Sequence, residues 1–208
     1  MNGKYIGNYI FCEKITQDEG RIEIQDISDF GKSKYTDING DDVIDLKDGG
    51  FILEIDVRKD AEFYFTSKEG VVFTLKDPDN VSEDILDYIK KTIQKAEDIL
   101  FDENFKNENE GWKKYFDINS FIDWYLVNEF SKYHDSSFQT SVYLYFNPKD
   151  EKIHMGPNWD FDLGFGNSGE KYTDYKSDGW LIKNAKWISR FFEDESFVSK
   201  VKSRWNEK

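Results

Sequence analysis

The feature that most constrains the fold of this sequence is a pair of short segments joined by a tight turn. Residues 142–146 alternate in the manner of a β-strand, and residues 152–155 are typical of a returning strand. The Asn-Pro-Lys-Asp sequence between them, at 147–150, is typical of a turn. Together these segments predict a β-hairpin. The two strands of a hairpin lie about 5 Å apart across the ladder, so the segments that enter and leave it must be neighbours.

Aspartates flank the predicted hairpin on both sides. Asp135 precedes it, just after a predicted helix, and Asp160 and Asp162 follow it within a Trp-Asp-Phe-Asp sequence. The hairpin therefore predicts that Asp135 lies near the other two, although 25 residues separate it from Asp160. If the second segment is extended, Asp160 and Asp162 point to the same face, because side chains two apart on a strand do so.

Three carboxylates in one place repel one another, and such a cluster persists when a cation neutralises it. Oxygen ligands favour Mg²⁺, Mn²⁺ or Ca²⁺ over Zn²⁺. The order of helix, aspartate loop, hairpin and second aspartate segment resembles the core of protein kinases. There, one Asp orients the substrate hydroxyl and another holds the metal on the phosphates. The alternative interpretation is a turn of solvated or helix-capping aspartates.

The other periodicities predict a mixed α/β (α+β) fold in one domain. Ser82 caps a predicted helix with apolar residues at helical spacing as far as Leu100, and Asp117 caps a second helix that ends near Tyr133. The expected core residues of this second helix include Phe121, Tyr125, Leu126 and Phe130. Further strands are predicted at 5–11, 51–57, 63–65 and 71–75, loops at 29–50 and 102–111, and a last helical region at 187–205.

The composition argues against several kinds of partner. The chain carries 42 acidic and 28 basic residues, a net charge of −14, which disfavours nucleic acid and anionic membranes and favours a basic protein segment. Six Trp, twelve Tyr and eighteen Phe indicate a folded globular protein. No run approaches eighteen apolar residues, so no membrane span is expected. The single cysteine, Cys12, is expected to be a small core residue.

Four segments, in order, resemble the spore coat protein H (CotH) kinase family. They are residues 2–13, similar to its NGxYxGxYxxxE segment; residues 49–56, similar to GGYxLExD; residues 124–130 with Asp135, similar to its WYLxxEL…D helix and loop; and residues 157–167, similar to its GPxWDxDxxxG signature. Each segment alone is weak, but the combination is specific. The resemblance covers nearly the whole chain.

The resemblance implies an atypical protein-kinase-like fold over residues 1–208, mainly the helical C-lobe with part of the N-lobe sheet. It implies transfer of the γ-phosphoryl of ATP, with Mg²⁺, to Ser or Thr of a protein partner, here a basic, Ser/Thr-rich one. Asp135 matches the catalytic aspartate, Asp160 and Asp162 match the metal-binding pair, and Glu13 falls where a kinase hinge would meet the adenine. By family analogy, the setting is a spore coat or the cell surface.

Two departures from the family pattern bear on activity. The Asn-Gly hairpin signal at 2–3 has only one residue before it, so we expect that the N-terminal part of the family domain, with its phosphate-binding Lys, is absent. We therefore expect weak catalysis by this chain alone. Kinase catalytic loops also carry an Asn five residues after the Asp, where this sequence has Thr140 followed by Ser141. A hydroxyl ligates Mg²⁺ less strongly than an amide carbonyl.

Other interpretations stay open at this point. Residues 37–48 resemble a calcium loop, but a solvated turn explains them as well, since Asp42 replaces the expected Gly. His134 and His154 have either a structural or a functional role. Asp135 and Asp160 would also serve as the acid and the nucleophile of a glycosidase. The alternative to an enzyme is a non-catalytic spore-coat or cell-surface assembly protein with a kinase-like core.

Overall fold

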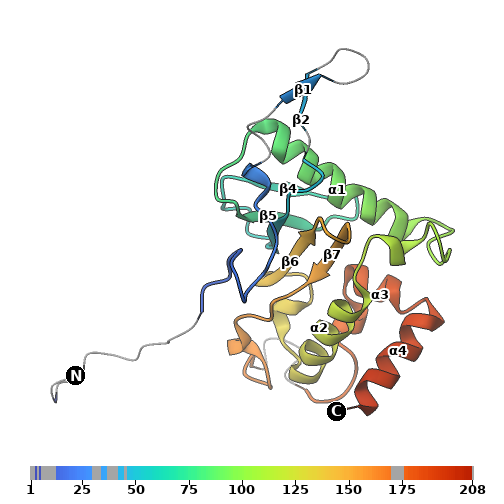
Figure 1. The fold of residues 1–208 in the computed structure, drawn as a ribbon. Helices are drawn as coiled ribbons and strands as arrows, with labels where there is room; N and C mark the ends of the chain where they lie inside the picture. Colours follow the sequence, from blue (N-terminus) through green and yellow to red (C-terminus); the bar gives the residue numbers. More distant parts are fainter. Residues whose placement is uncertain are drawn as a thin grey trace.

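A five-stranded antiparallel sheet forms the centre of the computed structural model (Figure 1). The structure describes residues 13–29, 34–36, 42–44, 46–169 and 176–207, together with Gly3 and Tyr5. The strand order is β4-β5-β3-β6-β7. The strands are β3 (Phe51–Ile55), β4 (Tyr64–Thr66), β5 (Val72–Asp77), β6 (Val142–Asn147) and β7 (Lys152–Met155). The mixed α/β fold expected from the sequence is confirmed.

The predicted hairpin is confirmed as β6 and β7, which pair antiparallel with Leu144 opposite Met155. On its other side β6 pairs antiparallel with β3, so that Glu54 lies opposite Tyr143. β3 is therefore the central strand. Because the two strands are antiparallel, its last residue, Ile55, faces the first residue of β6. The candidate site lies at this junction.

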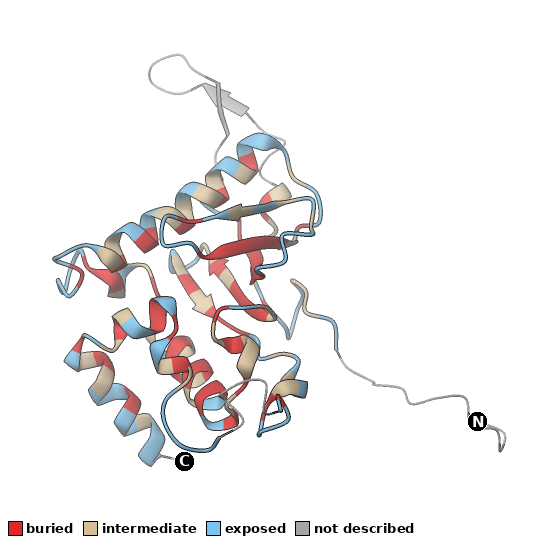
Figure 2. Ribbon diagram, turned by 180° about the vertical axis from the view of Figure 1, so that it is seen from behind, coloured by how far each residue is buried: buried red, intermediate tan, exposed pale blue. Residues whose placement is uncertain are grey.

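Four α-helices accompany the sheet in the part of the chain that the structure describes. They are α1 (Glu83–Phe101), α2 (Ile118–Ser131), α3 (Lys186–Phe191) and α4 (Glu195–Asn206). α1 runs past β4 and β5, whereas α2, α3 and α4 gather beyond the β6–β7 hairpin (Figure 1). Buried residues are concentrated in the central strands and on the inner faces of the helices (Figure 2).

The predicted cap of α1 is confirmed, because Ser82 Oγ accepts a hydrogen bond from the Ile85 N–H at 3.4 Å. The apolar face of α1 is buried, as its spacing predicts: Ile85, Ile89, Ile93, Ala96 and Leu100. Glu97 on the same helix is also fully buried. Its carboxylate accepts hydrogen bonds from the Ser67 hydroxyl at 2.7 Å and the Trp187 indole N–H at 2.8 Å. This polar contact ties α1 to the turn after β4 and to α3.

Helix α2 begins as predicted, but one of its apolar side chains lies elsewhere than expected. Asp117 Oδ1 accepts the Ser120 N–H at 2.7 Å, as a helix cap does. Phe121 and Tyr125 are buried, whereas Phe130 is 67% exposed. The prediction that Phe130 belongs to the core is therefore wrong. The apolar side chains of α2 surround the helix, so their spacing alone did not show which of them face the sheet.

The helical region predicted at 187–205 consists of two helices. α3 ends at Phe191, and α4 begins after Asp194, whose carboxylate accepts the Ser196 N–H at 2.8 Å and the Trp112 indole N–H at 2.9 Å. The change of direction brings Phe191 and Phe197 into a stack with ring centroids 5.5 Å apart. This aromatic contact joins α3 to α4.

The predicted loop at 29–50 contains a short antiparallel ribbon, β1 (Lys34–Thr36) with β2 (Asp42–Ile44). The hairpin turn at 2–3 and the strand at 5–11 lie outside the described residues, apart from Gly3 and Tyr5. So do Cys12 and most of the oxygen-bearing positions of the loop at 37–48.

In the described ranges, no helix combines the length and the apolar character that a transmembrane span needs.

Candidate functional site

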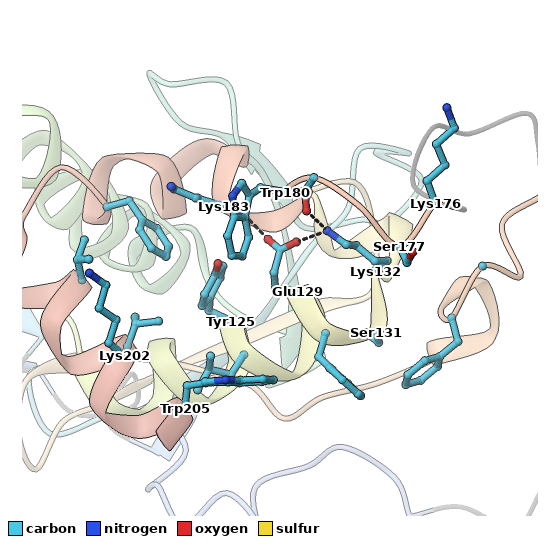
Figure 3. A pocket seen from close by; sticks show the side chains of 18 residues that line it. Tyr125, Glu129, Ser131, Lys132, Lys176, Ser177, Trp180, Lys183, Lys202 and Trp205 are labelled. Carbon is cyan, nitrogen blue, oxygen red and sulfur yellow. Dashed lines mark hydrogen bonds and ion pairs between the residues drawn. The ribbon is translucent and has the colours of Figure 1, made fainter. Parts of the chain in front are cut away.

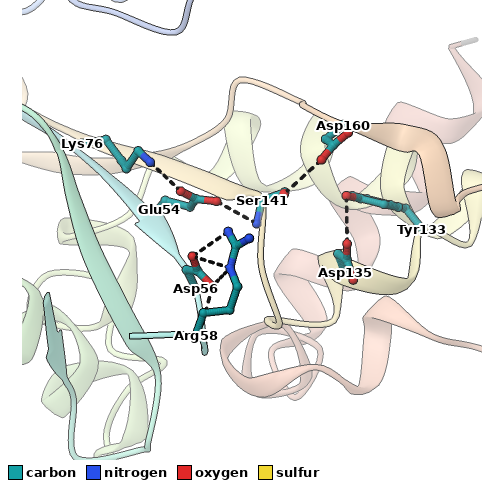
Figure 4. Close-up of polar contacts among 8 residues, drawn as sticks. All are labelled: Glu54, Asp56, Arg58, Lys76, Tyr133, Asp135, Ser141 and Asp160. Atoms are coloured by element: carbon teal, nitrogen blue, oxygen red, sulfur yellow. Dashed lines mark hydrogen bonds and ion pairs between the residues drawn. The ribbon is translucent and has the colours of Figure 1, made fainter. Parts of the chain in front are cut away.

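The candidate site lies where the loop between α2 and β6 passes the C-terminal end of β3 (Figure 4). The Val57 N–H donates to Gln139 O at 2.8 Å, which joins this loop to the chain that leaves β3. The segment after the hairpin returns to the same place, since the Phe165 N–H donates to Ser131 O at 2.6 Å. The prediction that the hairpin brings these two segments together is therefore confirmed.

Asp135 lies in a short 3₁₀ turn, His134–Ser136, and its side chain is half-buried. The Tyr133 hydroxyl donates to Asp135 Oδ2 at 3.3 Å. Burial is the main cause of a raised pKa of the Asp135 carboxyl. The charges of Asp162 and Asp160 raise this pKa further, against the opposing influence of His134 and the Tyr133 hydroxyl. The charges of Asp160 and Asp162 thus act on the Asp135 carboxyl in the same direction as its burial.

Asp160 and Asp162 are both exposed, but they do not lie on an extended segment. Asp160 has a left-handed backbone, with φ 57° and ψ 57°, and Asp162 lies in the 3₁₀ turn Phe161–Leu163. The expectation that they point to one face of a strand is therefore wrong, because a tight turn replaces the strand. Ser141 Oγ donates to Asp160 Oδ2 at 3.4 Å. Ser141, which follows the position of the kinase Asn, thus places its hydroxyl beside the Asp160 carboxylate.

Tyr133 links the two aspartate segments. Its hydroxyl bonds to Asp135, and its ring lies against that of Phe161, with centroids 5.0 Å apart. The side chain is fully buried. Burial, together with the charges of Asp135 and Asp160, raises the pKa of the Tyr133 phenol, so it stays protonated and donates its hydrogen bond at neutral pH. Tyr133 therefore fixes the relative position of the two loops.

The three aspartates do not form an enclosed metal cage. Among the residues that the structure describes, no three or more His, Cys, Asp or Glu side chains are arranged to hold a metal ion. The structure thus gives no support for a site of three carboxylates around one cation, and the metal-binding role of Asp160 and Asp162 stays a prediction. The remaining donors suit a cation that takes most of its ligands from water or from a substrate.

Two further carboxylates, which sequence reasoning missed as site residues, lie at the C-terminal end of β3, and one of them, Glu54, holds the loop. Glu54 is 4% exposed. Its Oε1 accepts the Ser141 N–H at 3.0 Å, and its Oε2 pairs with Lys76 Nζ at 3.0 Å (Figure 4). Burial, and then the charge of Glu54, raise the pKa of Tyr143, which lies opposite on β6.

Asp56, two residues further on, is 3% exposed and forms a bidentate salt bridge with Arg58. Arg58 Nε lies 2.9 Å from Oδ1, and Nη2 lies 2.8 Å from Oδ2. Burial on its own raises the pKa of Asp56, but the hydrogen bonds and charge of Arg58 outweigh it and hold this pKa below its usual value. Two carboxylates in an otherwise apolar strand were the sequence signal for these residues.

Glu13, the predicted nucleotide-binding residue, lies outside this group of aspartates. It is exposed, and its Oε1 accepts a 2.8 Å hydrogen bond from Arg21 Nε. It lines a pocket of about 520 Å³ together with Tyr145, Asn158 and Trp159. Trp159 immediately precedes Asp160, so this pocket adjoins the aspartates.

The two histidines differ in their surroundings. His154 stacks on Tyr145, with ring centroids 4.9 Å apart and an interplanar angle of 11°, and its Nε2 lies 2.9 Å from Asp150 Oδ2. These contacts give His154 a structural role on the hairpin. His134 precedes Asp135 and opposes the rise of its pKa.

The comparison with protein families gives the class of this protein. Residues 1–208 match the model of a family described as "CotH kinase protein". The chain is therefore a kinase-like protein, a class that works with ATP and a divalent metal. It belongs to the CotH kinase family, as its motifs suggested. The match extends over the whole chain and gives no support to the expected loss of an N-terminal part. No curated protein and no solved structure matches the chain.

Proposed function

We propose that this protein is an atypical kinase-like phosphotransferase that moves the γ-phosphoryl of ATP to a Ser or Thr hydroxyl of a protein partner. One observation carries this proposal. A single buried residue, Tyr133, bonds to Asp135 through its hydroxyl and contacts Phe161, between Asp160 and Asp162, through its ring. A kinase needs such a fixed relation between the aspartate that meets the hydroxyl and those that meet the metal.

The donor set supports a Mg²⁺ ion shared with the nucleotide. Mg²⁺ is usually bound by one or two carboxylates together with waters and substrate phosphates. Asp160 and Asp162 are exposed and supply two such carboxylates. Their charges also raise the pKa of Asp135, which indicates an excess of negative charge that a divalent cation would relieve. Mn²⁺ or Ca²⁺ would suit the same oxygen donors.

Asp135 is the proposed catalytic residue. When bound, the cation neutralises charge on the phosphates. Asp135 orients the incoming hydroxyl and accepts its proton, and Tyr133 holds the carboxylate in place through its 3.3 Å hydrogen bond. A raised pKa favours this role, because a base whose pKa lies nearer the working pH accepts a proton more readily.

The pocket that Glu13 lines is the proposed place of the adenine. Trp159 and Tyr145 offer aromatic surface there, and Trp159 adjoins Asp160 in the chain. A base in this pocket would have its phosphates on the side of the aspartates. Glu13 would meet the base from the opposite segment, as the family resemblance implies.

We also propose that residues 1–208 form one kinase-like domain, mainly its helical lobe. In this assignment α2, α3, α4 and the β6–β7 hairpin belong to the helical lobe, and the rest of the sheet belongs partly to the smaller lobe. The net charge of −14 and the exposed aspartates support a basic partner. Its Ser or Thr residues are what transfer to a hydroxyl requires. The family association supports a spore coat or cell surface as the setting.

The second candidate is a non-catalytic assembly protein that uses the kinase-like core for binding. It is favoured by the hydroxyl side chains of Thr140 and Ser141 at the place of the kinase Asn. A transfer assay separates the two: the protein is incubated with γ-labelled ATP, Mg²⁺ and a basic Ser/Thr-rich protein. If the partner becomes labelled by the wild type but not by Asp135→Asn, the result supports the kinase proposal. ATP binding without any transfer would support the assembly protein instead.

A further inference from the structure

A groove of about 820 Å³ lies between α2, α4 and the segment around Trp180 (Figure 3). The side of α2 contributes Tyr125, Leu126 and Phe130 to its lining, and α4 contributes Val201 and Trp205, among others. The groove is separate from the pocket that Glu13 lines, because the two share no residue.

Large aromatic side chains stand open to solvent along this groove. Phe130, Phe165, Trp180 and Trp205 are 67%, 71%, 61% and 55% exposed. The ring of Phe130 lies 6.0 Å from that of Phe165 and 6.3 Å from that of Trp205, centroid to centroid, so three of them form a continuous band. Exposed apolar bands of this kind mark sites of interaction. Aromatic side chains in particular dominate the energetics of protein interfaces.

The charge around the groove has the opposite sign to that of the protein. The chain has a net charge of −14, yet the residues that line the groove include Lys132, Lys176, Lys183 and Lys202. Glu129 is the one acidic residue among the described lining residues. Its carboxylate forms an ion pair with Lys132 Nζ at 2.8 Å and accepts hydrogen bonds from the N–H groups of Leu181 and Lys183, each at 2.9 Å.

In the part of the chain that the structure describes, Lys183 and Lys202 have no carboxylate partner. Lys183 Nζ lies over the rings of Trp180, at 5.4 Å, and Phe192, at 5.2 Å. Lys202 is exposed on α4. Neither lysine forms an ion pair within the described ranges of the chain. Figure 3 shows both at one end of the groove and Lys176 at the other. The groove thus joins an apolar floor to a positive rim.

We propose that this groove docks a segment of a partner protein in which apolar side chains are flanked by Glu or Asp. The apolar side chains lie on the aromatic band, and the acidic ones meet Lys183 and Lys202. A pocket for a small molecule usually encloses most of its ligand. Aromatic side chains that are more than half exposed form instead a broad open surface, which suits a peptide segment.

The groove adjoins the aspartate site through the main chain. Ser131 and Phe165 both line it, and they are joined by the 2.6 Å hydrogen bond between their backbones. Asp135 follows Ser131 by four residues, and Asp162 precedes Phe165 by three. A partner held in the groove would therefore lie beside the aspartates. This last link rests on the proposed function, whereas docking itself needs neither ATP nor metal.

A displayed library of random linear peptides tests the proposal on the 208-residue chain. Without nucleotide or metal, the peptides retained are expected to combine Leu, Phe or Trp with Glu or Asp. Synthetic copies are then titrated by fluorescence anisotropy. K183E/K202E and Trp180→Ala should each weaken their binding by about tenfold or more, and salt should weaken it further. Lys200→Glu is the matched control, because Lys200 is exposed on α4 but does not line the groove.

The outcomes separate this proposal from its rivals. Retention of basic peptides, of none, or of acidic peptides that K183E/K202E binds equally well would overturn it. Phosphatidylserine vesicles that bind the protein and lose this binding in K183E/K202E, without selection of acidic peptides, would show a membrane surface instead. Loss of phosphate transfer in Asp135→Asn with peptide binding unchanged supports both proposals, whereas peptide binding without any transfer supports docking and refutes the kinase.

Discussion

The Ser141 N–H donates a 3.0 Å hydrogen bond to Oε1 of Glu54, which lies 87 residues earlier in the chain. Glu54 belongs to the central strand β3, and Ser141 closes the loop that carries Asp135. The Ser141 hydroxyl in turn lies 3.4 Å from Asp160 Oδ2. A buried carboxylate of the sheet therefore fixes one end of the loop, and Tyr133 fixes the other. The position of the candidate catalytic residue is therefore set by the sheet through Glu54 and by the loop itself through Tyr133.

Replacing Glu54 by Ala is expected to lower the free energy of unfolding by about 1–3 kcal/mol, because the part-buried Ser141 N–H loses its acceptor. Glu54→Gln keeps an acceptor oxygen and should cost less. Urea unfolding followed by circular dichroism measures both changes. Glu103→Ala, at an exposed position, is the control and should stay within about 0.5 kcal/mol. If both Glu54 variants matched this control, Glu54 would not hold the loop.

The raised pKa of Asp135 predicts how stability depends on pH. The folded protein holds this proton more tightly than the unfolded chain, so the carboxyl contributes less stability as pH rises from its unfolded pKa through its folded pKa. Asp135→Asn removes the titration. This variant should be more stable than the wild type at neutral pH, and its advantage should shrink in acid. Thermal unfolding across this pH range measures the difference, and a less stable variant at neutral pH would contradict it.

Asp56 provides the opposite case, since Arg58 holds its pKa below the usual value. Its contribution is present above the unfolded pKa and is lost as pH falls through the folded pKa. Asp56→Asn should therefore be less stable than the wild type at neutral pH, with the deficit shrinking in acid. The same series of melts should give the two aspartate variants opposite signs. A common sign would show that Arg58 does not control the pKa of Asp56.

Phe121 and Phe130, nine residues apart on α2, test the correction to the predicted core. Phe121 is fully buried, and Phe121→Ala should cost about 3–5 kcal/mol through the cavity it leaves. Phe130 is 67% exposed, and Phe130→Ala should change the free energy of unfolding by about 0.5 kcal/mol or less. Chemical denaturation distinguishes the two. Similar losses of unfolding free energy at both positions would show that Phe130 does belong to the core.

The elements that the sequence predicted well are those with local causes. The β6–β7 hairpin follows from alternation and a turn within fourteen residues, and α1 follows from its cap and its apolar spacing. The break after Phe191 was missed because the cap of α4, Asp194, is also held by Trp112, which lies 82 residues away. A helical pattern of apolar residues does not show such a contact.

The candidate site was predictable in part for the same reason. The hairpin geometry placed Asp135 near Asp160, because it depends only on neighbouring segments. The left-handed turn at Asp160 has no local sequence cause of the kind that a glycine would give, so an extended segment was expected instead. The role of Glu54 arises from the pairing of β3 with β6, which joins distant parts of the chain. Asp56, in contrast, is held by Arg58, two residues away. Their charge in an apolar strand was nevertheless a visible signal.

A titration of the protein with ATP, with and without Mg²⁺, tests the central claim most directly. Calorimetry on the wild type should show binding that requires the metal, and Asp160→Asn and Asp162→Asn should each weaken it by about tenfold or more. Both positions are exposed, so neither change should impair folding. Asp87→Asn, at an exposed position on α1, is the matched control and should bind as the wild type does. Metal-independent binding, or an affinity that neither aspartate variant changes, would contradict the proposed site.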